Sequence, residues 1–132
     1  MLLIRGTNAD GSLLAPRLTA EVAPAQDNDG WPRWQRGGQR QTLMGWGRLN
    51  WFGKDPNWKD QLDFRGNHDV ERNYGEWNLL ECRCDRGHIQ VMLNGTLINE
   101  AFETWPQNGQ ILLQCEGSEI FFRRLELQGL SQ

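Results

Sequence analysis

The sequence predicts an all-β protein, an antiparallel β-sandwich. Three observations favour this class. No stretch shows the 3.6-residue spacing of apolar side chains that marks an amphipathic helix. Short runs of alternating apolar and polar residues recur along the chain, which is typical of half-buried strands. The 15 glycines punctuate these runs where turns are expected. Several short strands at this spacing, without helices, indicate a sandwich of antiparallel sheets.

The length of 132 residues fits one domain, because single hydrophobic cores usually span roughly 100–150 residues. We therefore expect residues 1–132 to form one sandwich domain, with an irregular segment rich in tryptophan and arginine over residues 24–73. The longest apolar run is far shorter than the roughly 20 residues that a membrane-spanning helix requires. The chain starts without a signal-peptide pattern, since its first arginine follows the apolar run instead of preceding it.

The N-terminal half is expected to contain three strands. Met1–Arg5 is a short apolar run, and Arg17–Ala23 alternates apolar with polar residues. Gly6–Ser12 between them is expected to be a polar loop. Pro24–Gln41 is predicted to be a long loop, a length that favours a functional segment. Thr42–Phe52 is predicted to be a strand interrupted by glycines.

Two hairpins are predicted in the C-terminal half. Trp77–Asp85 and His88–Leu93 are expected to pair, because a turn with Gly87 joins them. Asn94 and the glycine that follows it form the strongest short hairpin signal in the chain, a type I′ turn. This turn leads into a strand over Thr96–Asn99.

Two final strands are predicted over Gln110–Cys115 and Glu119–Leu127. In the second of these, the apolar side chains change phase by one residue. This slip predicts a β-bulge near residues 122–123.

The charge is mildly acidic overall but uneven along the chain. The net charge of −3 comes from 14 Lys+Arg against 17 Asp+Glu, which argues against a general nucleic-acid binder. The stretch Gly30–Lys54 nevertheless holds five cations and no acidic residue: Arg33, Arg36, Arg40, Arg48 and Lys54. Basic residues between aromatic ones can bind single-stranded nucleic acid, and they can equally bind sugar acids or negatively charged glycans.

Four runs in the C-terminal part carry a resemblance to a known family. In order, they are Gly75-Glu76-Trp77-Asn78, Leu93-Asn94-Gly95, Ile111-Leu112-Leu113-Gln114 and Glu116-Gly117-Ser118-Glu119-Ile120-Phe121-Phe122-Arg123, and the run Asp69-Val70-Glu71-Arg72 precedes them. Their order and spacing over Asp69–Leu127 resemble the 3-keto-disaccharide hydrolase domain family.

The resemblance implies a concanavalin A-like jelly roll whose concave face handles sugars. It implies a glycoside-cleaving hydrolase, or a lyase-type enzyme, that acts on 3-keto-glucosides or related disaccharides. Family members are often secreted by bacteria, so a periplasmic or extracellular location is implied. Members usually carry at least two further strands before the position of Met1, so a truncated or short form is expected here. The alternative function is a non-catalytic carbohydrate-binding module of the same fold.

Five candidate residues follow from the chemistry of glycoside cleavage. This reaction commonly needs a carboxylic acid and a second carboxylate. In a 3-keto sugar, the carbonyl acidifies the neighbouring C–H, so a base can also start an elimination. Glu21, His68 and Glu116 are the predicted catalytic groups, with Arg33 and Gln114 orienting the substrate. Alternatively, the carboxylates lie on a solvated sheet face and His68 belongs to a polar loop.

Aromatic side chains provide the candidate stacking platforms. Five of the seven tryptophans lie in stretches rich in glycine and proline: Trp31, Trp34, Trp46, Trp51 and Trp58. Aromatic rings beside polar side chains suit sugars, whose C–H faces stack on rings. Trp34 and Trp51 are the predicted platforms, and a packed aromatic cluster beneath a long loop is the alternative.

No cofactor is required by the sequence, and a divalent metal is one alternative. His68 with Asp69 and Glu71 is the only local group of imidazole and carboxylate, a combination that suits several metals. Cys82 and Cys84 share one strand face, where small core residues are expected instead of a zinc site. A carbohydrate is the expected ligand, with neither nucleic acid nor membrane as a partner. Homo-oligomers through an open sheet edge are a further expectation.

Overall fold

The structure, a computed structural model, describes residues 1–55, 57, 59, 61, 64–115 and 119–130. These residues form nine β-strands and no helix, and all the strand pairs are antiparallel. The predicted all-β class is therefore confirmed. Within the same ranges, no helix is long and apolar enough to cross a membrane.

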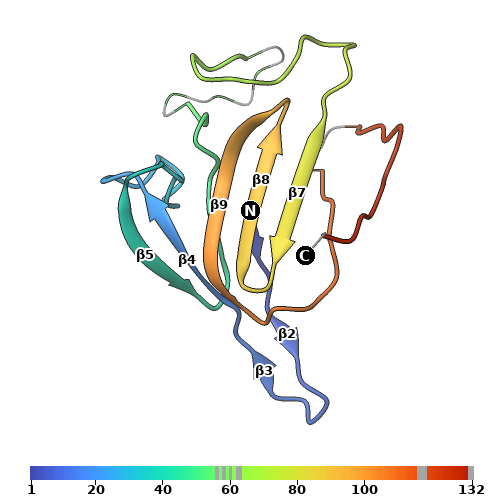
Figure 1. The fold of residues 1–132 in the computed structure, drawn as a ribbon. Coiled ribbons are helices and arrows are strands. Elements are labelled where there is room, and N and C mark those ends of the chain that lie inside the picture. Colours follow the sequence, from blue (N-terminus) through green and yellow to red (C-terminus); the bar gives the residue numbers. More distant parts are fainter. Residues whose placement is uncertain (56, 58, 60, 62–63, 116–118, 131–132) are drawn as a thin grey trace.

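Five strands form the main sheet, in the order β5-β4-β9-β8-β7 (Figure 1). Their bounds are Arg17–Val22 for β4, Gln39–Met44 for β5, Leu80–Asp85 for β7, His88–Leu93 for β8 and Thr96–Trp105 for β9. Two short ladders accompany this sheet. In the first, β1 (Leu2–Leu3) pairs with β6 (Gly47–Arg48), and in the second, β2 (Gly6–Thr7) pairs with β3 (Leu13–Leu14).

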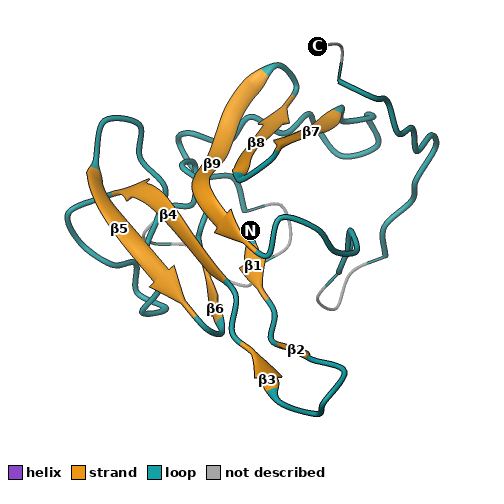
Figure 2. Ribbon diagram, turned by 60° about the horizontal axis from the view of Figure 1, so that its bottom comes forward, coloured by secondary structure: helices purple, strands orange, loops and turns teal. Residues whose placement is uncertain are grey.

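The hydrophobic core lies between the β1–β6 ladder and the inner face of the main sheet (Figure 2). β4 supplies most of the sheet's contribution, because the alternation of its side chains buries Leu18, Ala20 and Val22 together. Leu3 from β1 and Leu49 after β6 close the core from the other side. This two-layer antiparallel arrangement is consistent with a β-sandwich jelly roll.

Both predicted hairpins form. Asn94 and Gly95 have φ values of 51° and 82°, as the two central residues of a type I′ turn require. A second two-residue turn connects β7 to β8, and Arg86 takes the positive φ there. β9 extends to Trp105, well past the predicted end at Asn99, because it pairs with β8 along one edge and β4 along the other.

A β-bulge near the start of β9 changes which side chains face the core. Next to the turn, Met92 pairs with Leu97, but Val91 then pairs with Asn99. One extra residue therefore lies on the β9 side, and the residues beyond it change face relative to an unbroken ladder. As a result, Asn99 is 2% exposed in the interior, and Glu100 faces outward beside β8.

Several predicted elements are wrong. Gln110–Cys115 and Glu119–Leu127 form no strand, and so the bulge predicted near 122–123 does not exist either. Alternation in sequence makes a strand only where a neighbouring strand supplies hydrogen bonds, and these two segments have no ladder partner among the described residues. The predicted loop Gly6–Ser12 begins with β2, and the loop Pro24–Gln41 ends early, because β5 starts at Gln39.

The prediction that the cysteine-bearing face of β7 is core is also wrong. All six residues of this strand are exposed, including Leu80, Cys82 and Cys84. β7 lies at the end of the sheet, and the β1–β6 ladder covers the β4 side instead. An inward-facing side chain is buried only where a second layer lies above it.

Candidate functional site

Polar and aromatic side chains form a row on the outer face of the main sheet, the face turned away from the core. We call this row the outer-face cluster; it consists of Glu21, Arg40, His88, Gln90, Glu100 and Phe102. The strand registers place these residues side by side, because Glu21 pairs with Arg40 and Gln90 pairs with Glu100. The cluster thus crosses β5, β4, β9 and β8.

A histidine–carboxylate pair is the chemical centre of the cluster. His88 Nε2 lies 2.8 Å from Glu100 Oε1, and the amide of Gln90 donates a hydrogen bond of 2.8 Å to the same oxygen. The Glu100 side chain is 14% exposed, whereas the His88 side chain is 41% exposed. The carboxylate is therefore held inside the sheet surface, and the imidazole is open to solvent.

Aromatic and cationic side chains continue the row toward β5. The rings of His88 and Phe102 stack with centroids 5.0 Å apart and planes 15° apart. The Arg40 guanidinium lies 5.0 Å from the centroid of the Phe102 ring. Glu21 is 3.9 Å from Arg40, and its Oε2 also accepts a hydrogen bond of 2.7 Å from the N–H of Gly37. Glu21 thus anchors a loop and an arginine at the far end of the row.

This geometry prepares His88 to accept a proton. When its Nε2 carries the hydrogen that is donated to Glu100, the lone pair of Nδ1 is left free. A carboxylate partner favours this tautomer, because a carboxylate only accepts hydrogen bonds. Phe102 limits rotation of the ring by stacking. The row can therefore supply an oriented general base on an accessible surface.

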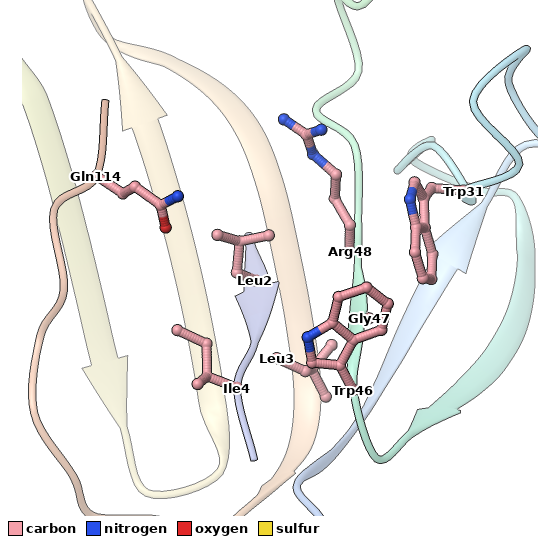
Figure 3. A pocket seen from close by; sticks show the side chains of 8 residues that line it. All are labelled: Leu2, Leu3, Ile4, Trp31, Trp46, Gly47, Arg48 and Gln114. Atoms are coloured by element: carbon pink, nitrogen blue, oxygen red, sulfur yellow. The ribbon is translucent and has the colours of Figure 1, made fainter. Parts of the chain in front are cut away.

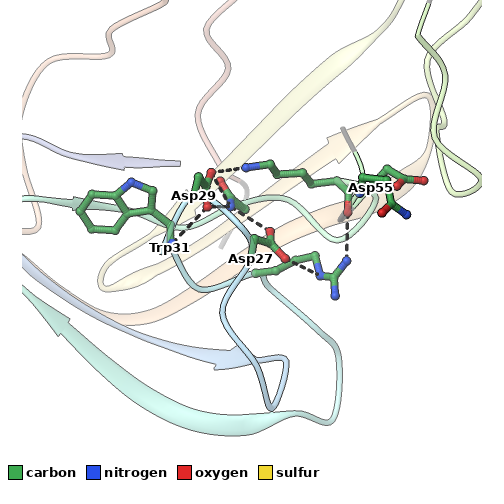
Figure 4. A network of polar contacts seen from close by, with 8 residues as sticks. Asp27, Asp29, Trp31 and Asp55 are labelled. Atoms are coloured by element: carbon green, nitrogen blue, oxygen red, sulfur yellow. Dashed lines mark hydrogen bonds and ion pairs between the residues drawn. The ribbon is translucent and has the colours of Figure 1, made fainter. Parts of the chain in front are cut away.

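A second polar group lies in the loops beside β6, and we call it the Asp29 network (Figure 4). It consists of Asp27, Asp29, Arg33, Asn50 and Lys54. The buried amide of Asn50 donates to Asp27 at 2.9 Å and to Asp29 at 3.2 Å. Arg33 pairs with Asp27 at 3.5 Å and donates to the carbonyl of Lys54 at 2.9 Å, while the Lys54 ammonium pairs with Asp29.

Asp29 is held ionised by this network. Burial alone raises the pKa of the carboxyl, but hydrogen bonds from Lys54, the Trp31 N–H and Asn50 outweigh burial and lower the pKa below its usual range. The N–H of Trp31 donates to Asp29 at 3.1 Å, and its carbonyl accepts from the Asp27 N–H at 3.0 Å. The network therefore fixes the backbone that carries the Trp31 ring.

The Trp31 ring lines an open groove of about 400 Å³, which we call the Trp46 groove (Figure 3). Its lining residues are Leu2, Leu3, Ile4, Trp31, Trp46, Gly47, Arg48 and Gln114. Trp31 and Trp46 meet edge to face, with centroids 5.6 Å apart and planes 72° apart. Because β1 and β6 cover the inner face of the main sheet, the core separates this groove from the outer-face cluster.

The chain matches the family described as the 3-keto-alpha-glucoside-1,2-lyase-like domain over residues 6–128. This match covers nearly the whole chain. The protein belongs to this family. Its carbohydrate-active role follows from that membership. No curated protein and no solved structure matches the chain. The predicted resemblance is confirmed, and it extends well beyond the C-terminal part.

Within this lyase-like domain, the predicted substrate-binding residues separate into different places. Gln114 lines the Trp46 groove, and Arg33 is engaged in the Asp29 network. Trp51 is half-buried and meets Phe52 edge to face at 5.5 Å, so its role in stacking stays a prediction. Trp34 is 3% exposed in the core, where no ring face is open to a sugar. We therefore remove Trp34 from the candidate site.

The predicted catalytic residues lie on three separate segments of this domain, and their catalytic roles stay predictions. Glu21 belongs to the outer-face cluster, and Glu116 lies outside the described residues. His68 is exposed in a loop, and no described hydrogen bond or ion pair joins its side chain to Glu21. Burial and the charge of Asp69 raise the pKa of Glu71, and Arg65 partly offsets them.

The fit of the described residues to a metal ion can be tested directly. Among them, no three His, Cys, Asp or Glu side chains come close enough to hold a metal, and His68 with its acidic neighbours forms no such group. The Sγ atoms of Cys82 and Cys84 lie 3.7 Å apart on the exposed face of β7 without a third ligand of this kind. We therefore derive no step of this domain's chemistry through a metal.

His88 and Glu100 are the residues of this domain that sequence reasoning missed. His88 follows a turn and reads as an exposed strand residue, and Glu100 is twelve positions away. The pairing of β8 with β9 was predictable from the Asn94-Gly95 turn. The signal was incomplete, however, because the bulge decides that Glu100 and not Asn99 shares the face of His88.

Proposed function

We propose that the chain cleaves the glycosidic bond of 3-keto-glucosides by elimination across C1 and C2, with His88 as the general base. The contact of 2.8 Å between His88 and Glu100 on an accessible sheet face carries this proposal. The family description supports the reaction class, because it refers to a 3-keto-alpha-glucoside and to a lyase acting at positions 1 and 2.

Elimination starts with removal of a proton from C2, so this reaction depends mainly on a general base. The carbonyl at C3 acidifies the hydrogen on C2, so Nδ1 of His88 takes that proton and the C2–H electron pair forms an enolate. The enolate then forms the C1=C2 bond, and the C1–O bond breaks with its electrons on the leaving oxygen. A proton returns to that oxygen, and so the two products together contain the atoms of the substrate. Glu100 stabilises the imidazolium between these steps.

The remaining members of the cluster are proposed to bind and orient the sugar. Arg40, beyond the Phe102 ring, offers donors to hydroxyl oxygens of the part that leaves. Glu21 acts as a positioning residue for Arg40, through their contact of 3.9 Å. This arrangement retains Glu21, one of the predicted residues, in a role other than proton transfer.

The test incubates the protein with a 3-keto-trehalose-type disaccharide and with ordinary trehalose, and analyses the products by mass spectrometry. Elimination gives an unsaturated keto-sugar that is lighter by one water than the hydrolysis product. We expect this product from the 3-keto substrate only. His88→Gln should lower the rate by about 10²–10⁴-fold, the usual contribution of a general base.

Glu100→Gln and a distant control complete the design. Glu100→Gln should slow the reaction, because the imidazolium loses its carboxylate partner. His68→Gln serves as the matched control and should leave the rate unchanged if His88 is the base. A rate that falls with His68→Gln and not with His88→Gln would contradict the assignment. The heavier product would show hydrolysis instead of elimination.

A non-catalytic carbohydrate-binding module is the second candidate, and the Trp46 groove favours it. Trp46 is 64% exposed, and the groove also presents the amide of Gln114 above an apolar floor. Rings and amides of this kind bind sugars without any titratable group. Measurable glycan binding, without product from either disaccharide, would establish the binding module and reject the enzyme.

A further inference from the structure

The basic stretch Gly30–Lys54 loses most of its free charge in the fold. Arg33 pairs with Asp27, Arg40 with Glu21, and Lys54 with Asp29. Arg36 and Arg48 are the other two cations, and neither has a carboxylate within 4.0 Å among the described residues.

These two arginines differ in their surroundings. Arg36 is exposed in the turn before β5. Arg48 is half-buried and lines the Trp46 groove, and Figure 3 shows its guanidinium pointing away from the Trp46 ring. A partly desolvated guanidinium interacts more strongly with an anion than one surrounded by water. Arg48 is therefore the cation of this stretch that is placed to bind an acidic ligand.

The other walls of the groove suit a sugar ring. Figure 3 shows Trp31 and Gln114 on opposite sides of Arg48, with Trp46 below it. Leu2 and Ile4 form an apolar surface with 45% and 53% exposure. C–H faces of a pyranose pack on such rings and aliphatic groups, while its hydroxyls bond to the amide.

Hydrogen bonds and close packing hold Trp31 in place at its side of the groove. The Asp29 network holds both backbone hydrogen-bonding groups of Trp31, and Gly47 lets the ring lie close, since a Cβ there would be 3.3 Å from it. Leu2 pairs with Arg48 in the β1–β6 ladder, which places their side chains next to each other on one face of the ladder. Pre-formed sites of this kind lose little entropy on binding.

We propose that the Trp46 groove is a second carbohydrate site, which binds a pyranose carrying an acidic substituent through Arg48, with Trp46 as the stacking platform. This inference rests on the proposed carbohydrate function, but not on catalysis by the outer-face cluster. A planar guanidinium donates two parallel hydrogen bonds to a carboxylate or to a phosphate. The proposed ligands therefore include both sugar acids and sugar phosphates.

Calorimetric titration tests the proposal with three probes: a disaccharide ending in glucuronic acid, glucose 6-phosphate, and the neutral counterpart of the disaccharide. We expect the acidic probes to bind about tenfold more tightly than the neutral one, from one charge-assisted contact. This preference should shrink as NaCl is added. A stronger response to the uronate or to the phosphate identifies which acid the groove prefers.

Two pairs of variants separate the site from the rest of the surface. Arg48→Gln should abolish the preference for the acidic probes, whereas the matched control Arg36→Gln should keep it. Trp46→Ala should weaken the binding of all three probes. The control Trp77→Ala, at another exposed tryptophan, should leave the binding of all three unchanged. Equal affinity for the acidic and neutral probes, or equal behaviour of the two arginine variants, would overturn the proposal.

Two variants separate the test of the acidic-sugar site from the test of the proposed cleavage reaction. His88→Gln should keep its binding of the acidic probe while it loses cleavage of the 3-keto substrate. Arg48→Gln should keep cleavage while it loses the acid preference. Loss of both properties in either variant, with unchanged thermal unfolding, would place them at one site and overturn the second-site proposal.

Discussion

β4 and β7 are strands of equal length in the same sheet, and both alternate apolar with polar residues, yet only β4 is buried. The inward side chains of β4 are at most 4% exposed, whereas Leu80 in β7 is 54% exposed. β4 has a neighbour on each side and the β1–β6 ladder above it, while β7 has one neighbour among the described strands and forms one of the two sheet edges. Alternation therefore specifies a strand, and the second layer specifies its burial.

The largest expected effect is a difference between two leucine truncations. Leu18→Ala should lower the free energy of unfolding by about 2–5 kcal/mol, because it leaves a cavity in the core. Leu80→Ala should change it by about 0.5 kcal/mol or less, since the side chain is exposed. Urea unfolding of both variants measures the difference. Equal losses would show that β7 is covered in solution and would remove the contrast between the strands.

The second-largest effect tests how much the Asp29 network stabilises the loops beside the core. Asn50→Ala should cost about 1–3 kcal/mol, because the buried carboxylate of Asp27 loses a donor. The matched control, Asn57→Ala, changes an exposed residue and should cost about 0.5 kcal/mol or less. The same urea experiment reports both values. A neutral Asn50→Ala would mean that the loops carry Trp31 without help from the Asp29 network.

A smaller effect is expected on the stability of the protein at acidic pH. The pKa of Asp29 lies below its usual value of 3.8 in the folded protein, so the unfolded chain binds a proton first as the pH falls. The stability that this carboxylate contributes is present above pH 3.8 and is lost progressively below it. Asp29→Asn should therefore be less stable at neutral pH and less steeply destabilised below about pH 4. Thermal unfolding across this range gives the comparison, and parallel curves for both proteins would contradict it.

The smallest expected effect is self-association through the open edge. β7 is an edge strand with six exposed residues, and exposed edges favour pairing with another chain. A homo-oligomer stays a prediction, which light scattering over a range of protein concentrations would test. The charge reversal Arg83→Glu, in the middle of this strand, should change the association, whereas the same change at Arg72 in the preceding loop should not. A single mass at all concentrations would reject association.

Only part of the structure around the candidate site could be predicted from the sequence. The type I′ turn at Asn94 was predictable, because its φ values demand that dipeptide. The burial of Trp34 was not, because its loop position suggested exposure and only the packing of Leu49 and Val22 around it decided otherwise. The Gln110–Cys115 strand failed for the opposite reason, since its local pattern was right but no described strand pairs with it.

The sequence by itself determined the all-β class, the two hairpins and the family, because each depends on local turn chemistry, alternation or the order of short motifs. The tertiary structure decided which faces are covered and which residues meet. The clearest instance is the bulge between Val91 and Met92 on the β8–β9 ladder. Without that extra residue, Asn99 would face outward and Glu100 inward, since a shift of one residue exchanges the two faces of a strand. The pairing of His88 with Glu100 therefore depends on a register that no local pattern encodes.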